Sequence, residues 1–430
     1  MEFRGLEKLE ERVLVSGSPY DNLISGPGKF TYEGDNGVVV VTLKGPVSGS
    51  WEIDSERDLF MDLDGTTNKT SVTIKGEADL KELNVEGDLK SFSGVNTDVN
   101  GFLDIHGDVK SVKLDDVIYN NDFGGGLEIE GDVGSVRLGD IGDGCIINVE
   151  GHAKSIRLTE VSGGEVEVGS AGSISVYGDF NRGYSWSEGL VKSFSVKGDV
   201  IKSHIFYDKL GSFSVKGNKY RTGKLVDTAL VGIENGFKEG KFSVRGDIDN
   251  SYLGRFYSYS IGGNIANSRV DLGQYVSKFS VRGSLVDVLM QNSFPNATMK
   301  SLSVGGNAHN LRTFIGWNPG ADEIYSTGDD EGFTTGNPYS PLSVSIGGSF
   351  GNSYLVSKGF SGKWLNKIKL GSVSPQNGGV HYGIFSENAG ELIDRGRIKF
   401  GRYKYTMPIG DFVVDEPEIG TRQPPTPPPF

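Results

Sequence analysis

One phrase recurs from Gly76 to about Gly348, and it limits the folds open to this chain. The phrase is an alternating apolar run that closes with Gly-Asp or Gly-Asn and continues with a small apolar residue. Its clearest copies are S-F-S-V-K-G-D-V at Ser193–Val200, K-F-S-V-R-G-D-I at Lys241–Ile248, K-F-S-V-R-G-S-L at Lys278–Leu285 and S-L-S-V-G-G-N-A at Ser301–Ala308.

The spacing of the closing glycines indicates a repeat architecture. Most gaps are near 20 residues, with outliers of 11, 29 and 42, and a regular period of this size is typical of solenoids. Each apolar-polar alternation predicts a strand with one buried face. Glycine is expected to supply a positive φ at a sharp corner, and Asp or Asn to tolerate the left-handed region. The closing glycines are Gly76, Gly87, Gly107, Gly131, Gly151, Gly178, Gly198, Gly217, Gly246, Gly263, Gly283, Gly306 and Gly348.

One coil cannot bury its own apolar stripe, so neighbouring coils must stack. The sequence therefore predicts an all-β, single-stranded parallel β-helix, or β-solenoid, with about 20 residues per coil. Leucine-rich repeats need a regular L-x-x-L-x-L skeleton, and a propeller needs a period of about 40 residues. The sequence has neither, and it leaves open whether a coil holds two or three strands.

Four segments follow from where the repeat begins and ends. Residues 1–70 are expected to form an N-terminal cap, with a helical turn through Phe3, Leu6, Leu9 and Val13. Residues 71–373 form the parallel β-helix, residues 374–420 a C-terminal cap of strands and irregular chain, and residues 421–430 a proline-rich tail.

Composition excludes several classes of partner. The net charge is −13, and Lys and Arg are distributed along the strands without a concentrated basic face, so nucleic acid is not expected as a partner. The single Cys145 excludes a disulfide scaffold. No stretch of 18 apolar residues predicts a membrane span. Met1–Arg12 is too charged for the core of a signal peptide, so synthesis and assembly in the cytoplasm are expected if Met1 is the native start.

The acidic motifs do not predict a catalytic or metal site. Asp62-Leu63-Asp64-Gly65 lacks the rest of a calcium loop and is expected to be a plain turn. Asp115-Asp116 with Asn120-Asn121-Asp122 offers paired carboxylates, which a glycosidase would need, but solvated corner residues explain them better. We therefore expect no catalytic residues, no metal and no cofactor.

Aromatic and polar departures from the repeat are the candidate binding regions. The segments 180–190, 255–259 and 311–339 are expected to be loops inserted into the stack, where binding faces of repeat proteins are often found. The alternative is that these aromatics pack on the solenoid wall or on a second subunit. The candidate ligand-binding residues are Tyr184, Trp186, Trp317, Tyr325, Asp329, Asp330, Phe333 and Tyr339.

The end of the chain is rich in proline and favours a polyproline II tail. Such a tail loses little entropy when it docks in an aromatic groove of a partner, although a plain disordered end is the alternative. The candidate partner-docking residues are Pro424, Pro425, Pro427, Pro428, Pro429 and Phe430.

The phrases K-S-F-S-V-K-G-D-V and S-L-S-V-G-G-N resemble the repeats of right-handed β-helix surface proteins, over about residues 73–346. These include bacterial adhesins, viral tailspike shafts and virion appendages. Together with the regular repeat, the single cysteine and the proline-rich tail, this resemblance leads us to expect a non-enzymatic structural or interaction protein. Its β-helix would be a rigid spacer, and its partners would be proteins, including further copies of the chain. Two alternatives remain, a carbohydrate-binding adhesin that meets a cell-surface glycan and a polysaccharide-degrading enzyme of the pectate-lyase type.

Overall fold

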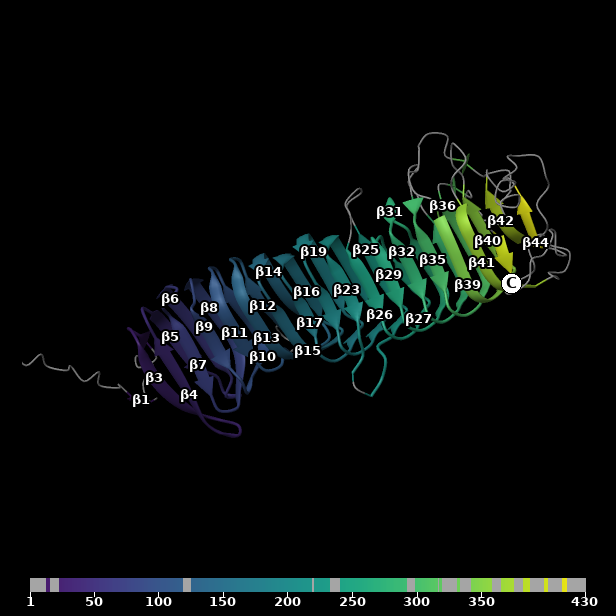
Figure 1. Ribbon diagram of the computed structural model, residues 1–430. Coiled ribbons are helices and arrows are strands. Elements are labelled where there is room, and N and C mark those ends of the chain that lie inside the picture. Colours follow the sequence, from purple (N-terminus) through teal and green to yellow (C-terminus); the bar gives the residue numbers. More distant parts are fainter. Residues whose placement is uncertain are drawn as a thin grey trace, which may run out of the picture. The chain divides into compact units, whose positions relative to one another are not determined.

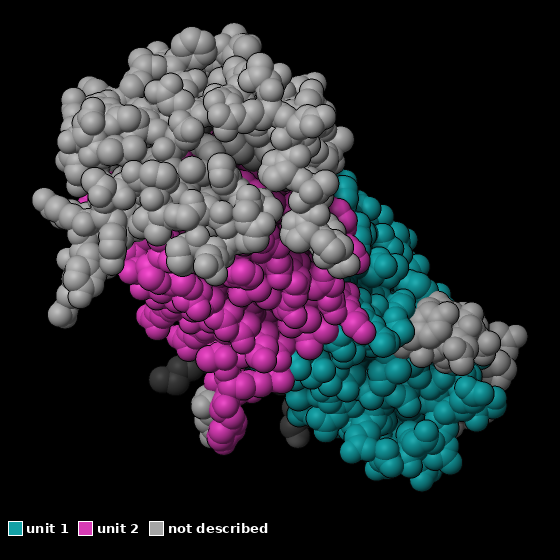
Figure 2. All heavy atoms as spheres, turned by 90° about the vertical axis from the view of Figure 1, so that its right-hand side faces the viewer, with its two compact units in different colours: residues 1–191 teal, residues 192–430 magenta. Residues whose placement is uncertain are grey.

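The chain forms a β-solenoid of about 13 turns, with parallel coils stacked about 20 residues apart and no helix among the described residues. The predicted fold class is confirmed. The chain divides into two compact units, Met1–Val191 (unit 1) and Lys192–Phe430 (unit 2), which are coloured separately in Figure 2. The computed structural model describes residues 13–15, 23–118, 125–218, 220–232, 240–291, 298–315, 317–318, 331–332, 342–357, 365–374, 382–386, 398–400 and 412–415.

Unit 1 begins with mostly antiparallel strands. β3 (Gly28–Gly34) pairs with β4 (Gly37–Lys44), which pairs with β7 (Ser71–Lys75). β5 (Ser48–Ile53) pairs with β2 (Leu23–Ile24) and with β6 (Leu59–Thr66). The rings of Phe30 and Trp51 stack between these strands with centroids 4.2 Å apart.

Two predictions for this region are wrong. Val13 lies in β1 (Val13–Val15), which pairs with β3, and not in a helical turn. Phe3, Leu6 and Leu9 lie outside the described residues. The expected turn at Asp62–Gly65 is part of β6, because Asp62 is held in register opposite Ser50.

The strands of successive coils in unit 1 form two long parallel stacks (Figure 1). The first, which we call the acidic stack, pairs its strands in register through residues such as Leu103, Leu127 and Ile147. It contains β8 (Ala78–Gly87), β10 (Thr97–Ile105), β12 (Gly125–Ile129), β14 (Cys145–Ala153), β16 (Glu165–Ala171) and β19 (Tyr184–Val191). The second contains β7, β9 (Ser91–Gly94), β11 (Val109–Leu114), β13 (Val133–Ile141), β15 (Ile156–Ser162), β17 (Ile174–Val176) and β18 (Phe180–Asn181).

The first three coils of unit 2 contain three strands each, whereas β30 (Ile265–Asp271) spans two of these positions in the next coil. The stack that carries the F-S-V phrase contains β20 (Phe194–Val196), β23 (Ser212–Val215), β26 (Lys241–Val244), β29 (Ser258–Ile261), β32 (Lys278–Val281), β35 (Ser301–Val304) and β39 (Leu342–Gly351). The other two stacks contain β21 (Val200–Ile201), β24 (Leu225–Val226) and β27 (Ile248–Asp249), and β22 (His204–Leu210), β25 (Ala229–Gly232) and β28 (Tyr252–Leu253).

Longer strands continue these two stacks toward the C-terminus. They are β30 (Ile265–Asp271), β33 (Leu285–Gln291), β36 (Ala308–Ile315), β40 (Tyr354–Ser357), β42 (Tyr382–Ser386) and β44 (Phe412–Asp415), while β41 (Leu365–Val373) and β43 (Ile398–Phe400) extend the first stack. Two short pairs, β31 (Tyr275–Val276) with β34 (Thr298–Met299) and β37 (Trp317–Asn318) with β38 (Glu331–Gly332), lie outside this sheet.

A ladder of aromatic rings fills the core of unit 2. Phe194, Phe213, Phe242, Tyr259 and Phe279 occupy the same position in successive coils and are buried. Successive ring centroids are 5.7, 5.7, 5.6 and 4.8 Å apart, and each such pair adds about 0.5–1.5 kcal/mol beyond its buried area. Because Tyr259 belongs to this ladder, the prediction of an inserted loop at 255–259 is wrong there.

The corner glycines are needed mainly for close stacking. Among the closing glycines of the repeat, only Gly76, Gly87 and Gly217 have a positive φ, so the predicted reason is wrong for the rest that the structure describes. A Cβ on Gly283 would lie 2.6 Å from the carbonyl oxygen of Gly263 in the preceding coil. Positive φ falls instead at another corner, on Arg182, Lys202, Asp227, Asn250, Asn267, Asp287, Asn310 and Asn352.

The polar residue after the closing glycine joins one coil to the next. In unit 1, the backbone N–H of Asp132 donates to Asp108 Oδ1 over 2.8 Å. In unit 2, the N–H of Asn264 donates to Asp247 Oδ1 over 2.8 Å, and Asn264 Oδ1 accepts from the N–H of Ser284 over 2.8 Å. We call this row of hydrogen bonds the corner ladder, and it explains why Gly is followed by Asp, Asn or Ser.

We expect Gly283→Ala to destabilise the protein by about 1–3 kcal/mol, because its new methyl group would collide with the backbone of Gly263. Gly351→Ala is the matched control. Its methyl group would meet neighbours only at ordinary contact distances of 3.5 and 3.6 Å. Urea unfolding of both variants checks the prediction, and equal stability of the two would contradict the stacking role.

Candidate functional site

Strand β19 turns two aromatic side chains toward the outer face of unit 1. Ser185 and Ser187 are 3% and 2% exposed, whereas Tyr184 and Trp186, which alternate with them, are only partly buried. Side chains of a strand alternate between its two faces, so the serines occupy inner positions that apolar residues take in other coils. The segment 180–190 is therefore not the inserted loop that the sequence predicted, because β18 and β19 belong to the stack.

Trp186 lines a groove of about 390 Å³ that crosses three coils of unit 1. The register places Trp186 beside Glu167 and Tyr184 beside Glu165. The other lining residues are Asn148, Glu150, Glu167, Val168, Gly169 and Glu188. We call this site the Trp186 groove.

The carboxylates of the Trp186 groove repel one another. The pKa of Glu167 is raised by burial and then by the charges of Glu165 and Glu188. Burial also raises the pKa of Tyr184, as do Glu167 and Glu165. An indole face with carboxylate and amide oxygens around it can stack on a ring or a cation and accept hydrogen bonds from hydroxyl groups.

Of the other predicted ligand-binding residues, the structure describes Trp317. Trp317 lies in unit 2, on strand β37, opposite Gly332 of β38. Tyr325, Asp329, Asp330, Phe333 and Tyr339 lie outside the described residues. The same holds for the tail residues Pro424, Pro425, Pro427, Pro428, Pro429 and Phe430.

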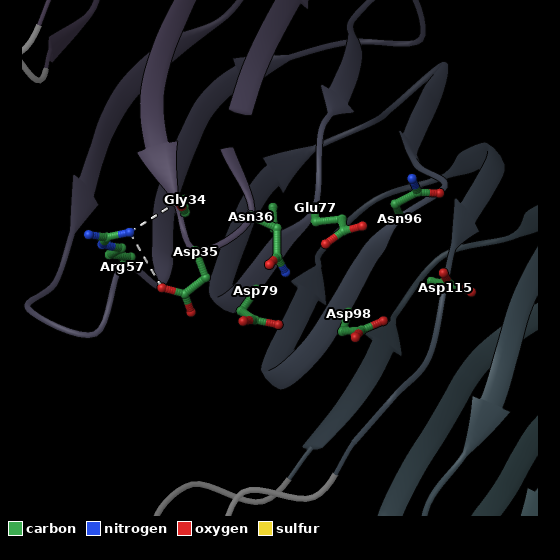
Figure 3. Close-up of a pocket in the computed structure, with 10 residues that line it drawn as sticks. Gly34, Asp35, Asn36, Arg57, Glu77, Asp79, Asn96, Asp98 and Asp115 are labelled. Atoms are coloured by element: carbon green, nitrogen blue, oxygen red, sulfur yellow. Dashed lines mark hydrogen bonds and ion pairs between the residues drawn. The ribbon is translucent and has the colours of Figure 1, made fainter. Parts of the chain in front are cut away.

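A second groove, of about 520 Å³, is lined largely by carboxylates (Figure 3). Sequence reasoning singled out only Asp115 among its residues. Arg57 lies at one end, where its Nη1 donates to the carbonyl of Gly34 over 3.2 Å and lies 3.6 Å from Asp35 Oδ1. We call this site the acidic groove; its polar lining residues are Asp35, Asn36, Arg57, Glu77, Asp79, Asn96, Asp98 and Asp115.

Register explains how these carboxylates meet. Asp79 and Asp98 are partners across β8 and β10. Asp98 Oδ1 accepts the N–H of Asp116 over 3.2 Å, and Asp116 Oδ1 accepts the N–H of Asp140 over 2.6 Å. Asp116 thus supports the stacking of coils, while Asn120, Asn121 and Asp122 lie outside the described residues. The signal in the sequence was an Asp repeated at about one coil length.

The acidic groove shifts the pKa of its own carboxyl groups. The pKa of Asp79 is raised by burial and then by the charges of Asp58, Asp98 and Asp35, against a smaller lowering by Lys81. The pKa of Asp98 is raised by burial, although the hydrogen bond from Asp116 opposes that shift. A carboxylate cluster alone does not define a ligand, so we treat this groove as an electrostatic strain in the fold.

Two further charged clusters of unit 1 form ion pairs within the chain. Asp54, Glu56 and Asp58 are close enough together for a metal ion, but Lys81 Nζ lies 3.0 Å from Asp58 Oδ2 and 3.7 Å from Glu56 Oε2. The buried ammonium of Lys81 therefore supplies the positive charge there, and its hydrogen bond to Asp58 raises its pKa.

His106 connects three successive coils. Its Nδ1 lies 2.9 Å from Glu130 Oε1, and its Nε2 lies 3.6 Å from Asp104 Oδ2 and 3.7 Å from Glu86 Oε1. The hydrogen bond to Glu130 is the main reason that the pKa of His106 is raised. The imidazole therefore links coils through ion pairs when it is protonated.

Comparisons of the chain with protein-family models, with curated proteins and with solved structures found no match. Within the part of the chain that the structure describes, no helix has the length and apolarity that a membrane crossing requires.

We expect Asp79→Asn to stabilise the protein at pH 7, because it removes a charge that burial and neighbouring carboxylates disfavour. The folded pKa of Asp79 lies above its unfolded value of about 3.9. The native charge therefore costs stability at neutral pH, and this cost disappears as the pH falls through the folded pKa. Thermal unfolding at a series of pH values from 7 down to about 4, near the unfolded pKa, measures the difference.

Asp143→Asn is the control for this experiment, because it removes the same charge from an exposed corner of unit 1. An Asp79→Asn variant that is less stable than the wild type at pH 7, or whose advantage grows as the pH falls, would contradict the electrostatic strain.

Proposed function

We propose that the protein is a non-enzymatic structural and interaction protein, such as a virion appendage, spike or surface fibre, in which the β-solenoid is a rigid spacer. The observation that supports this proposal is that the polar residues of the repeat bond one coil to the next. Their side chains are engaged in the scaffold, as the corner ladder shows.

A second row of side chains makes the stacking of unit 2 more specific. Ser251 is 4% exposed, and its hydroxyl donates to the carbonyl of Asp249 over 2.7 Å. The same oxygen accepts the N–H of Thr228 over 3.2 Å, and the N–H of Ser251 donates to Ser268 Oγ over 3.1 Å. A slip of one residue would leave these buried donors unpaired, at about 1–3 kcal/mol for each group.

Contacts of this kind oppose sliding and bending between neighbouring coils. A rigid spacer requires such resistance. Each coil is held by backbone pairing, by the corner ladder and by core side chains stacked in register. We propose protein partners, and a second copy of the chain among them, as the contacts of such a spacer. In this proposal the proline-rich tail is the segment that docks on a partner.

Absolute mass by light scattering tests the assembly proposal. We expect the full chain to form a stable homo-oligomer, and a chain that ends at Gly420 to fall to monomer if the tail is the docking segment. An oligomer that does not depend on the tail would place the contacts on the solenoid. A monomer in both cases would contradict a self-assembling fibre.

A second function, carbohydrate binding, is supported by the Trp186 groove. In most strands of the stack the inward side chains are apolar and the outward ones polar. In β19 the inward side chains include two serines and the outward ones include the Trp186 indole. An aromatic platform bordered by hydrogen-bond acceptors suits the apolar face and the hydroxyl rim of a sugar ring. In this proposal the spacer also carries a glycan-binding site on its wall.

We expect Trp186→Ala to lower the affinity for a bound glycan at least about tenfold, equal to ~1.4 kcal/mol, because the stacking platform is lost. Trp186→Phe should retain much of the affinity, since a ring remains. Tyr220→Ala is the control, because Tyr220 is an exposed aromatic in unit 2, outside the groove. Binding to an oligosaccharide array is the measurement, and unchanged binding by Trp186→Ala would remove this site.

A further inference from the structure

The strand stack that carries the F-S-V phrase in unit 2 contains no acidic residue, although the chain has 56 Asp and Glu against 43 Lys and Arg. From residue 192 to 197, and in the matching segments 211–216, 240–245, 257–262, 277–282 and 300–305, the charged residues are all basic. They are Lys192, Lys197, Lys216, Lys241, Arg245, Lys278, Arg282 and Lys300, and every one of them is exposed.

Register arranges this face in parallel rows. A central row of serines runs through Ser195, Ser214, Ser243, Ser260, Ser280 and Ser303, one in each coil. Two positions farther along the strands lies a row with Lys197, Lys216, Arg245 and Arg282, and Gly262 and Gly305 fill the other two coils. On the other side of the serines, Lys241 and Lys278 alternate with Ser258 and Ser301. We call these rows together the basic serine face.

Five cations of this face have no carboxylate partner within the part of the chain that the structure describes. They are Lys216, Arg245, Arg282, Lys241 and Lys278. Neighbouring coils lie about 4.8 Å apart, so like charges in adjacent coils repel. An anionic occupant would relieve that repulsion.

Unit 1 also has a row of cations on its second strand stack, although Asp140 and Glu160 are paired on β13 and β15 of the same stack. Lys113, Arg137 and Arg157 are partners in three successive coils. The acidic stack of the same unit instead carries rows of Asp and Glu, such as Asp104 and Glu128. Some Lys and Arg of each unit therefore form rows on one strand stack, which was not predicted from the sequence, while others, such as Lys81 and Arg269, lie elsewhere.

We propose that the basic serine face of unit 2 binds a linear acidic polysaccharide that lies along the direction of coil stacking. This ligand class lies beyond the proposed spacer role and is distinct from the Trp186 groove. Cations that recur about every 4.8 Å along the stack suit a linear polymer whose negative charges also recur along one direction. The Ser hydroxyls between the cations can both donate to carboxylate groups and accept from sugar hydroxyls.

Other anionic polymers fit this face less well. Its three rows hold serine, lysine, arginine and glycine, while Tyr257 of segment 257–262 lies beside the rows and packs against Tyr275. Proteins that bind single-stranded nucleic acids without sequence preference use aromatic side chains on which the bases stack, and none stands in these rows. Membrane-surface binding usually adds an apolar face that enters the headgroup region, and these rows contain no apolar side chain.

The test is a titration of the full chain against fluorescein-labelled polygalacturonate, with neutral dextran as the uncharged probe. We expect saturable binding that weakens with added salt, because the contacts are screened ion pairs, and no binding to dextran. The triple variant K216S/R245S/R282S should lose at least about tenfold in affinity. Serine and glycine already occupy neighbouring positions of the same face, so its thermal unfolding should match the wild type.

The matched control is K69S/K202S/K224S, which removes the same charge from exposed positions off the face. An equal loss of affinity in this control would overturn the proposal in favour of non-specific charge. So would an absence of polygalacturonate binding, or tighter binding to single-stranded DNA or to anionic vesicles. If the first triple variant dissociated a homo-oligomer and left polysaccharide binding unchanged, the occupant would be a second copy of the chain.

Discussion

The in-register stacking of coils is the constraint on which the rest of this structure depends. Parallel strands about 4.8 Å apart place the same position of every coil in one row. Each row must therefore contain side chains that can pack against similar side chains in the coils on either side. Aromatic rings do so in the core, from Phe194 to Phe279, by tilted stacking. Glycine does so at the corner, where a Cβ on Gly283 would collide with Gly263.

Charged rows are harder to stack, and the two units relieve them in different ways. In a carboxylate row, a backbone N–H of the next coil can donate to the oxygen, as Asp116 does to Asp98. This hydrogen bond opposes the pKa rise that burial causes at Asp98, and at Asp79 burial and the charges of neighbouring carboxylates raise the pKa. Cations cannot accept an N–H at all, so a row of Lys and Arg can be relieved only by solvent, by neighbouring carboxylates or by a ligand.

The repeat predicted the fold, but not what individual positions do. The alternation in S-F-S-V fixed the inward Phe and Val, and the period implied stacked coils. The same alternation in Tyr184-Ser185-Trp186-Ser187 cannot reveal which pair points inward, because that depends on the corner that precedes it. The sequence predicted a positive φ as the reason for glycine at Gly283. The structure gives another reason, because a Cβ there would collide with Gly263 of the preceding coil. The acidic groove escaped notice because its carboxylates come from different coils and only register unites them.

The outward residues of a strand stack can vary without any change in the core. In unit 2 the inward row is Phe, Tyr and Leu whether the outward neighbour is Lys241, Ser258 or Ser301. Because of this independence, the same scaffold can carry the Trp186 groove on one strand stack and the basic serine face on another. The overall charge of the chain is −13, but it does not show where a ligand would bind. Ligands of this protein should therefore be sought from the charges on each strand stack.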